Sequence, residues 1–144
     1  MRANKLTKAE KDQLQKIRRA SRVPFDELED VPAFLQNDKI AAAEFKRVFE
    51  NFAKIGLLDN LDRAILTAYA NAYSHYVQLS IDIQNNGDIL WKTDKSGNSY
   101  CVANPAVKLA DVYYQQMLRA SMKMGLSSVD RLKLCDLDTV KKSN

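Results

Sequence analysis

The chain has 144 residues, of which 46% are hydrophobic, and a formal net charge of +4. This length is enough for one domain with a modest core. No apolar run approaches the roughly 20 residues that cross a bilayer, and the basic first sixteen residues lack the apolar centre of a signal peptide, so we expect a cytoplasmic protein with no membrane partner.

The charge is unevenly distributed along the chain. Residues 1–22 carry eight basic and two acidic side chains, whereas residues 23–62 carry four basic and nine acidic ones. Thr7 and Glu10 form a capping box, which predicts a helix over 7–21 with few apolar residues. We therefore divide the chain into a basic N-terminal helix or arm (1–22), an acidic linker (23–36), a helical oligomerisation core (37–135) and a flexible tail (136–144).

The first helix of this core is predicted from Asp38 to Ile55. Its apolar residues recur at spacings of three and four, Asn37 would cap its start, and Gly56 would end it. The side chains expected to face the core are Ala41, Phe45, Val48, Phe49, Phe52 and Ile55. Those expected to face water are Glu44, Lys46, Arg47, Glu50 and Lys54.

The longest helix is predicted from Asp59 to Asn86, with Asp59 as its cap. Its apolar face is wide enough to pack against more than one neighbour. One stripe contains Ile65, Tyr69, Ala72, Tyr76, Leu79 and Ile83, and the adjacent one contains Leu66, Ala70, Tyr73 and Val77. The opposite side, expected to be polar, carries Thr67, Asn71, Ser74, Gln78 and Asp82.

A small β-hairpin is predicted over Ile89–Val102, because two apolar triplets flank a polar turn at 94–98. Asn104 and Pro105 then predict the cap and first residue of a helix that ends at Met124, before Gly125. The side chains expected on its inner face are Val107, Ala110, Tyr114, Met117, Leu118 and Met124, and those on its outer face are Lys108, Asp111, Gln115, Arg119 and Lys123.

Ser127 and Asp130 predict a short last helix over 127–134. The fold class is thus mainly α, with a long antiparallel helical hairpin, a third helix, a short C-terminal helix and a small β-hairpin insertion. A two-stranded hairpin is marginally stable alone, so we expect it to lean on the helices or on another subunit.

The basic N-terminal segment is the candidate DNA-binding site. Lysine and arginine bind phosphates through charge, and the release of counterions drives association. A solvated basic tail is the alternative interpretation. The candidate DNA-binding residues are Lys8, Lys11, Lys16, Arg18, Arg19 and Arg22.

The wide apolar face of helix 59–86 fits both an intramolecular core and a contact between subunits. Its tyrosines could also stack on bases, although tyrosine more commonly buries its ring and gives its hydroxyl a polar partner. The candidate oligomer-interface residues are Ile65, Tyr69, Tyr73, Tyr76, Leu79 and Ile83.

Catalytic motifs are absent from the sequence. His75 is the single histidine, and Cys101 and Cys135 are too few for a zinc site or a disulfide framework. The glycine-rich phosphate loop of ATPases is also missing. We therefore expect no enzymatic activity, no metal and no cofactor.

From about Pro32 to Leu134 the chain resembles the terminase small subunits of tailed bacteriophages, in the branch whose last elements are an Asn-Pro helix start and a Gly-Leu-Thr-Pro-x-x-Arg ending. Ser127 and Ser128 stand where that branch has threonine and proline. The matching residues are Gly56-Leu57 with Asp62, Tyr69-Ala70 through Tyr76, Gly87, Asn104-Pro105, and Gly125-Leu126 through Arg131.

The resemblance implies a DNA-binding adaptor that forms a ring of several copies in the host cytoplasm. It would recognise double-stranded viral DNA and deliver it to the terminase large subunit, which holds the ATPase and nuclease, for packaging. A small dimeric DNA-binding transcription regulator is the alternative function, with one recognition helix in a major groove. A nuclease is a third class, which would require a metal cluster or an acid–base pair.

Overall fold

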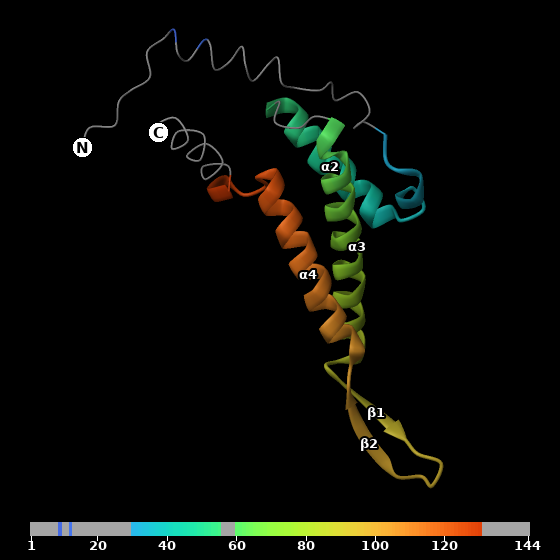
Figure 1. Cartoon of the computed structure of the whole chain (residues 1–144). Coiled ribbons are helices and arrows are strands. Elements are labelled where there is room, and N and C mark those ends of the chain that lie inside the picture. Colours follow the sequence, from blue (N-terminus) through green and yellow to red (C-terminus); the bar gives the residue numbers. More distant parts are fainter. Residues whose placement is uncertain (1–8, 10–11, 13–29, 56–59, 131–144) are drawn as a thin grey trace, which may run out of the picture.

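In the described part of the chain three long helices form the body, and a β-hairpin extends from one end of it (Figure 1). The computed structural model describes residues 9, 12, 30–55 and 60–130. The predicted fold class, mainly α with an inserted hairpin, is confirmed. The elements in order are η2 (Ala33–Leu35), α2 (Lys39–Ile55), η3 (Asn60–Asp62), α3 (Arg63–Asn86), β1 (Ile89–Thr93), β2 (Ser99–Ala103) and α4 (Pro105–Met124).

Helix α3 is the centre of the arrangement. Helix α2 crosses its N-terminal half, and α4 runs antiparallel beside the remainder (Figure 1). The core lies where the three helices meet, and Met124 closes it from the end of α4. The buried residues of this core are Leu35, Ala41, Phe45, Val48, Phe52, Leu66, Tyr69, Ala70 and Met124. The predicted inward stripe of α2 is thereby confirmed for Ala41, Phe45, Val48 and Phe52.

The cap of α2 is Asp38, and the prediction of Asn37 was wrong by one residue. The Oδ1 atom of Asp38 accepts hydrogen bonds from the backbone N–H groups of Ile40 and Ala41, each at 3.0 Å. Its Oδ2 atom accepts a 2.6 Å hydrogen bond from the hydroxyl of Ser74 in α3. One carboxylate therefore starts α2 and fastens it to α3, a double role that the amide of Asn37 does not have.

Two polar residues expected in water are buried. Glu44 is 5% exposed, and its carboxylate accepts two 2.7 Å hydrogen bonds from Arg47 and one of 2.9 Å from the hydroxyl of Tyr69. Ser74 is fully buried between Asp38 and Gln78. Both side chains lie where α2 crosses α3, and burial is tolerated because each has polar partners.

The ends of α4 follow the predicted signals. The side chain of Asn104 accepts a 3.0 Å hydrogen bond from the backbone N–H of Ala106, and Pro105 is the first helical residue. Gly125 ends the helix at φ 67° and ψ 42°, the left-handed region that glycine enters without strain. Ser127 accepts a hydrogen bond from the backbone N–H of Asp130, as the predicted capping pattern requires.

The inner face of α4 is narrower than predicted. Ala110 and Met124 are buried and Met117 packs against the core. Val107, Tyr114 and Leu118, which were also expected to face inward, are 41%, 40% and 38% exposed. Among the described elements α4 packs extensively on α3 alone, so it buries one narrow strip and leaves the apolar residues beside that strip in solvent.

The hairpin has its predicted turn at 94–98, where the Asp94 carboxylate accepts hydrogen bonds from the backbone N–H groups of Ser96 and Asn98. Its strands pair with Trp91 opposite Cys101. The strands contact each other extensively and the described helices only slightly (Figure 1). Trp91 is 74% exposed. The expectation that the hairpin leans on the helices is thus not met by the helices that the structure describes.

Several predictions fall on residues outside the described part of the chain. They concern most of the helix over 7–21, the turn at Gly56, the cap at Asp59, and the segment 131–144. Of the first of these helices, the structure describes Ala9 and Asp12, both in helical conformation. Helix α3 is described from Arg63, after the 3-10 turn of η3, and it ends at Asn86 as predicted.

Replacing Asn104 with alanine should lower the free energy of unfolding by about 1–3 kcal/mol. The substitution removes the cap of α4 and the 2.9 Å hydrogen bond that the buried Asn104 amide donates to the carbonyl of Gly87. Urea unfolding at one fixed protein concentration measures the loss. Asn104→Ser retains a capping oxygen and should lose less; equal losses for both variants would show that the cap does not contribute.

The pKa of Asp38 should make the attachment of α2 to α3 dependent on pH. Burial raises this pKa, but the hydrogen bonds from Ser74, Ala41 and Ile40 together lower it below its ordinary value of 3.8. Since the folded pKa lies below the unfolded one, the stabilisation is complete above pH 3.8 and is lost as pH falls through the lower folded value.

The matched variant is Asp38→Ala, which has no carboxylate to protonate. At pH 7 it should be less stable than the parent by about 1–2 kcal/mol. The difference between the two should shrink toward pH 3 in urea unfolding. A difference that stays constant over this range would contradict the stated role of the carboxylate.

Candidate oligomerisation surfaces

The seam between α3 and α4 has two aromatic contacts along its edges. The rings of His75 and Tyr113 stack with centroids 4.5 Å apart, and those of Tyr76 and Tyr114 lie 5.6 Å apart at 45°. Consecutive residues of a helix point about 100° apart. The two pairs therefore lie on opposite edges of the seam, which are called here the His75 edge and the Tyr76 edge.

An apolar ridge lies on the Tyr76 edge. Val107 and Leu118 are seven residues before and four residues after Tyr114, so all three lie on one side of α4. They are the three side chains predicted to face inward that the structure leaves exposed. We call Val107, Tyr114 and Leu118 the α4 ridge. Met122, one turn beyond Leu118, is 50% exposed, which extends the apolar surface to the end of the helix.

A shallow apolar groove lies on the His75 edge, between η2 and the N-terminal half of α3. Ala64, Ala68 and Asn71 line it from α3, and they precede His75 by eleven, seven and four residues, which places them on the same side of the helix. Pro32 and Phe34 line it from the other side. Phe34 is 68% exposed. This η2–α3 groove also includes Asn60, Arg63 and Thr67.

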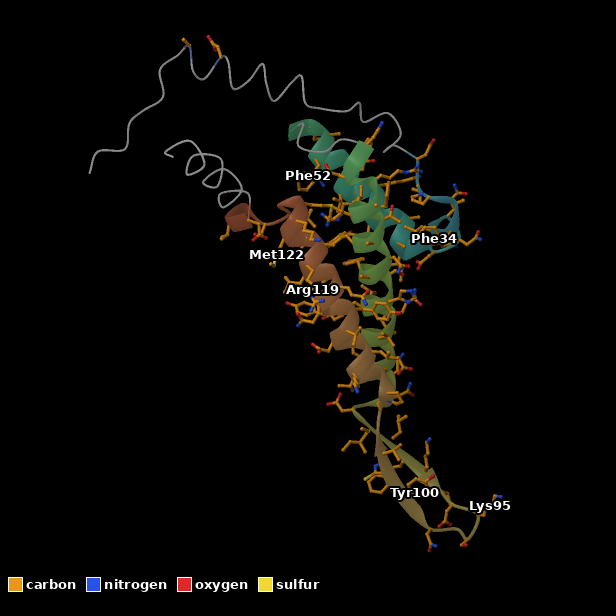
Figure 2. The ribbon with its side chains drawn as sticks, viewed as in Figure 1. Phe34, Phe52, Lys95, Tyr100, Arg119 and Met122 are labelled. Atoms are coloured by element: carbon orange, nitrogen blue, oxygen red, sulfur yellow. The ribbon has the colours of Figure 1, made fainter. Side chains whose placement is uncertain are left out.

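Arg63, the first residue of α3, also lines the groove. Its Nη2 atom donates a 3.3 Å hydrogen bond to the carbonyl of Asp30, but its Nε atom is buried and has no hydrogen-bond partner among the described residues. Phe34 and Met122 project from opposite sides of the body (Figure 2). The body therefore presents two different apolar surfaces, the groove and the ridge, on its two sides.

The polar centre between α2 and α3 supports these surfaces and offers no reactive group. Burial and the neighbouring Glu44 carboxylate raise the pKa of Tyr69 to about 12, so this phenol stays protonated and donates to Glu44. The hydrogen bond from Arg47 to Glu44 raises the pKa of the guanidinium above its ordinary value. A carboxylate with three satisfied hydrogen bonds is a structural anchor, and it positions α2 across α3.

The six α3 residues predicted to contact another subunit lie in three settings. Tyr69 is buried in its own protomer, and Tyr73 stacks on it at 6.3 Å. Tyr76 packs on Tyr114 beside the α4 ridge. Ile65, Leu79 and Ile83 are partly buried. Their contact with a second copy stays a prediction.

The six basic residues predicted to bind DNA lie outside the described part of the chain. Within the described ranges there is no cluster of histidine, cysteine and acidic side chains that could hold a metal ion. Among the same residues no helix has the length and apolarity needed to span a bilayer. Cys101 is exposed on β2 and forms no disulfide.

The sequence analysis predicted neither the groove nor the burial of Leu35. Val31 and Leu35 flank Pro32, and they pack against the core within the stretch interpreted as an acidic linker. The 3-10 turn of η2 begins directly after Pro32, with the backbone N–H of Leu35 donating to the Pro32 carbonyl at 2.8 Å. Pro32 followed three residues later by Leu35 could have indicated this buried turn. The acidic residues around it led us to interpret the segment as a linker.

The comparisons with known proteins agree with this architecture. The model of one protein family, described as phage terminase, small subunit, matches residues 41–139, which is about two thirds of the chain. No curated protein and no solved structure matches the chain. The matched range contains α2, α3, the hairpin and α4 complete except for the first two residues of α2. The chain therefore belongs to the phage terminase small subunit family.

Proposed function

We propose that this chain is a DNA-binding adaptor that assembles into a homo-oligomer and brings viral DNA to the terminase large subunit. The observation that carries the proposal is the family match over residues 41–139. The adaptor would act in the host cytoplasm and break no bond itself, since the large subunit would supply ATP hydrolysis and DNA cleavage.

Exposed apolar surface supports assembly. A monomer rarely exposes contiguous apolar surface of this kind without a partner. The described part of the chain exposes the α4 ridge, Phe34 and the apolar side of the hairpin, including Trp91. The predicted α3 stripe runs along the Tyr76 edge beside the ridge, so we propose that Ile65, Tyr69, Tyr73, Tyr76, Leu79 and Ile83 lie at or directly behind a contact between copies.

Positive charge in the N-terminal arm supports DNA binding. Residues 1–22 carry a balance of +6, against +4 for the entire chain. A single arm of this charge binds duplex weakly, but several arms held together add by avidity, because later contacts are intramolecular. We propose that Lys8, Lys11, Lys16, Arg18, Arg19 and Arg22 contact phosphates, and that the ring positions these arms near the motor.

Neutralising three basic residues of the arm should weaken binding to a duplex without changing assembly. In the triple variant Lys16→Gln, Arg18→Gln, Arg19→Gln, binding at about 0.1 M salt should fall at least tenfold. The plot of log K against log salt should become less steep by about 2.7 if three phosphate contacts are lost. Fluorescence anisotropy with a labelled duplex measures both quantities, and native mass spectrometry measures assembly.

The matched control removes the same charge from the outer face of α4, in the variant Lys108→Gln, Arg119→Gln, Lys123→Gln. All three residues are exposed. This variant should retain most of the affinity and most of the salt dependence. If both triple variants lose affinity equally, binding follows net charge alone and the arm has no special role. A parent chain that forms dimers only would favour the transcription regulator.

A further inference from the structure

We propose that neighbouring copies of this chain join head to tail, with the Leu118 end of the α4 ridge of one copy seated in the η2–α3 groove of the next. This inference rests on the proposed homo-oligomer and names the two surfaces that build it. A closed ring of more than two copies requires two different complementary patches on each subunit, whereas a two-fold dimer uses one patch twice. The described residues present such a pair of patches.

The two surfaces lie on opposite sides of the same pair of helices. The groove residues Ala64 and Ala68 share the His75 edge, and the ridge residues share the Tyr76 edge with Tyr114. A copy placed beside an identical copy therefore brings the ridge of one to the groove of the other. A line of copies joined in this way has a free ridge at one end and a free groove at the other, and these two surfaces meet when the line closes into a ring.

The surfaces also lie at the same level along the helices. Tyr76 contacts Tyr114, and α3 and α4 are antiparallel, so moving toward Arg63 in α3 corresponds to moving toward Met124 in α4. Asn71 lies about one turn before Tyr76, and Leu118 lies about one turn after Tyr114. Leu118 and Met122 are therefore level with Asn71 and Ala68 of the groove, whereas Tyr114 and Val107 are level with the part of α3 that follows it. Leu118 and Met122 are the side chains placed to enter the groove.

The shapes of the two surfaces match at that register. The groove offers small residues, Ala64 and Ala68, to the bulky ridge residues, so a protruding surface meets a hollow one.

The test uses two lysine substitutions, one in each surface. Leu118→Lys places a charge in the ridge, and Ala68→Lys fills the groove. Both positions are exposed, and lysine is a good helix former, so both variants should fold. Each variant alone should need an at least tenfold higher concentration for half-assembly than the parent chain, measured by mass photometry or analytical ultracentrifugation.

Mixing the two variants provides the decisive measurement. The Leu118→Lys chain retains an intact groove, and the Ala68→Lys chain retains an intact ridge, so one functional interface forms between them. An equimolar mixture should give a heterodimer and no larger species, because the remaining ridge and groove are both blocked. The matched control is Gln84→Lys near the end of α3, an exposed position away from both surfaces, which should assemble as the parent does.

The outcomes separate this inference from the proposed function. A parent that assembles while both lysine variants also assemble normally overturns the ridge-and-groove interface and leaves the adaptor function standing. Variants that each fail alone and form no heterodimer on mixing overturn the head-to-tail arrangement. A parent that stays monomeric at all concentrations overturns both proposals. Circular dichroism of each variant must match the parent before its assembly is compared.

Discussion

The hydrogen bond from Tyr69 to the buried carboxylate of Glu44 fixes how α2 lies on α3, and the other surfaces follow from that crossing. Glu44 also pairs with Arg47, so the carboxylate is fully satisfied at the crossing point. Removing one partner from such a pair leaves a buried charge without compensation, which costs far more than the pair itself contributes. The Asp38–Ser74 contact adds a second polar link between the same helices.

This crossing determines which side of α3 is left for α4 to pack against. Because α2 occupies one side of the N-terminal half of α3, η2 is held beside that half and the groove forms between them. Helix α4 then packs along the other side of α3, where it buries a narrow strip. The same three-helix geometry therefore creates both the hollow and the protruding apolar surfaces, and neither could change without moving the core.

Sequence analysis predicted well those parts of the fold that depend on a few neighbouring residues. Asn104, Pro105 and Gly125 specify the ends of α4 through backbone geometry, and the polar turn at 94–98 specifies the hairpin. These signals act over four or five residues, so they need no knowledge of the tertiary structure. The same is true of the apolar spacing in α2, which predicted its buried side from Ala41 to Phe52.

Apart from the cap of α2, which was misplaced by one residue, the errors involve contacts between distant segments. Glu44 and Ser74 look like solvent residues by polarity, and their burial depends on partners 25 and 36 positions away. The exposure of Val107, Tyr114 and Leu118 depends on how many helices surround α4, which periodicity alone does not specify. The candidate interface residues, all on α3, stay a prediction, whereas the free apolar surface on α4 and the groove beside Phe34 emerged only from the packing.

The exposed position of the hairpin also affects how readily the protein aggregates. A two-stranded ribbon that stands away from the helices presents unpaired backbone donors and acceptors along both outer edges, and such edges recruit strands from other chains. Lys92, Asp94 and Lys95 place charge near the tip of this ribbon, and charge on an edge opposes uncontrolled strand addition. We therefore expect charge at these three positions to oppose strand addition at the edges of the ribbon, and its removal to lower solubility before it alters the helical body.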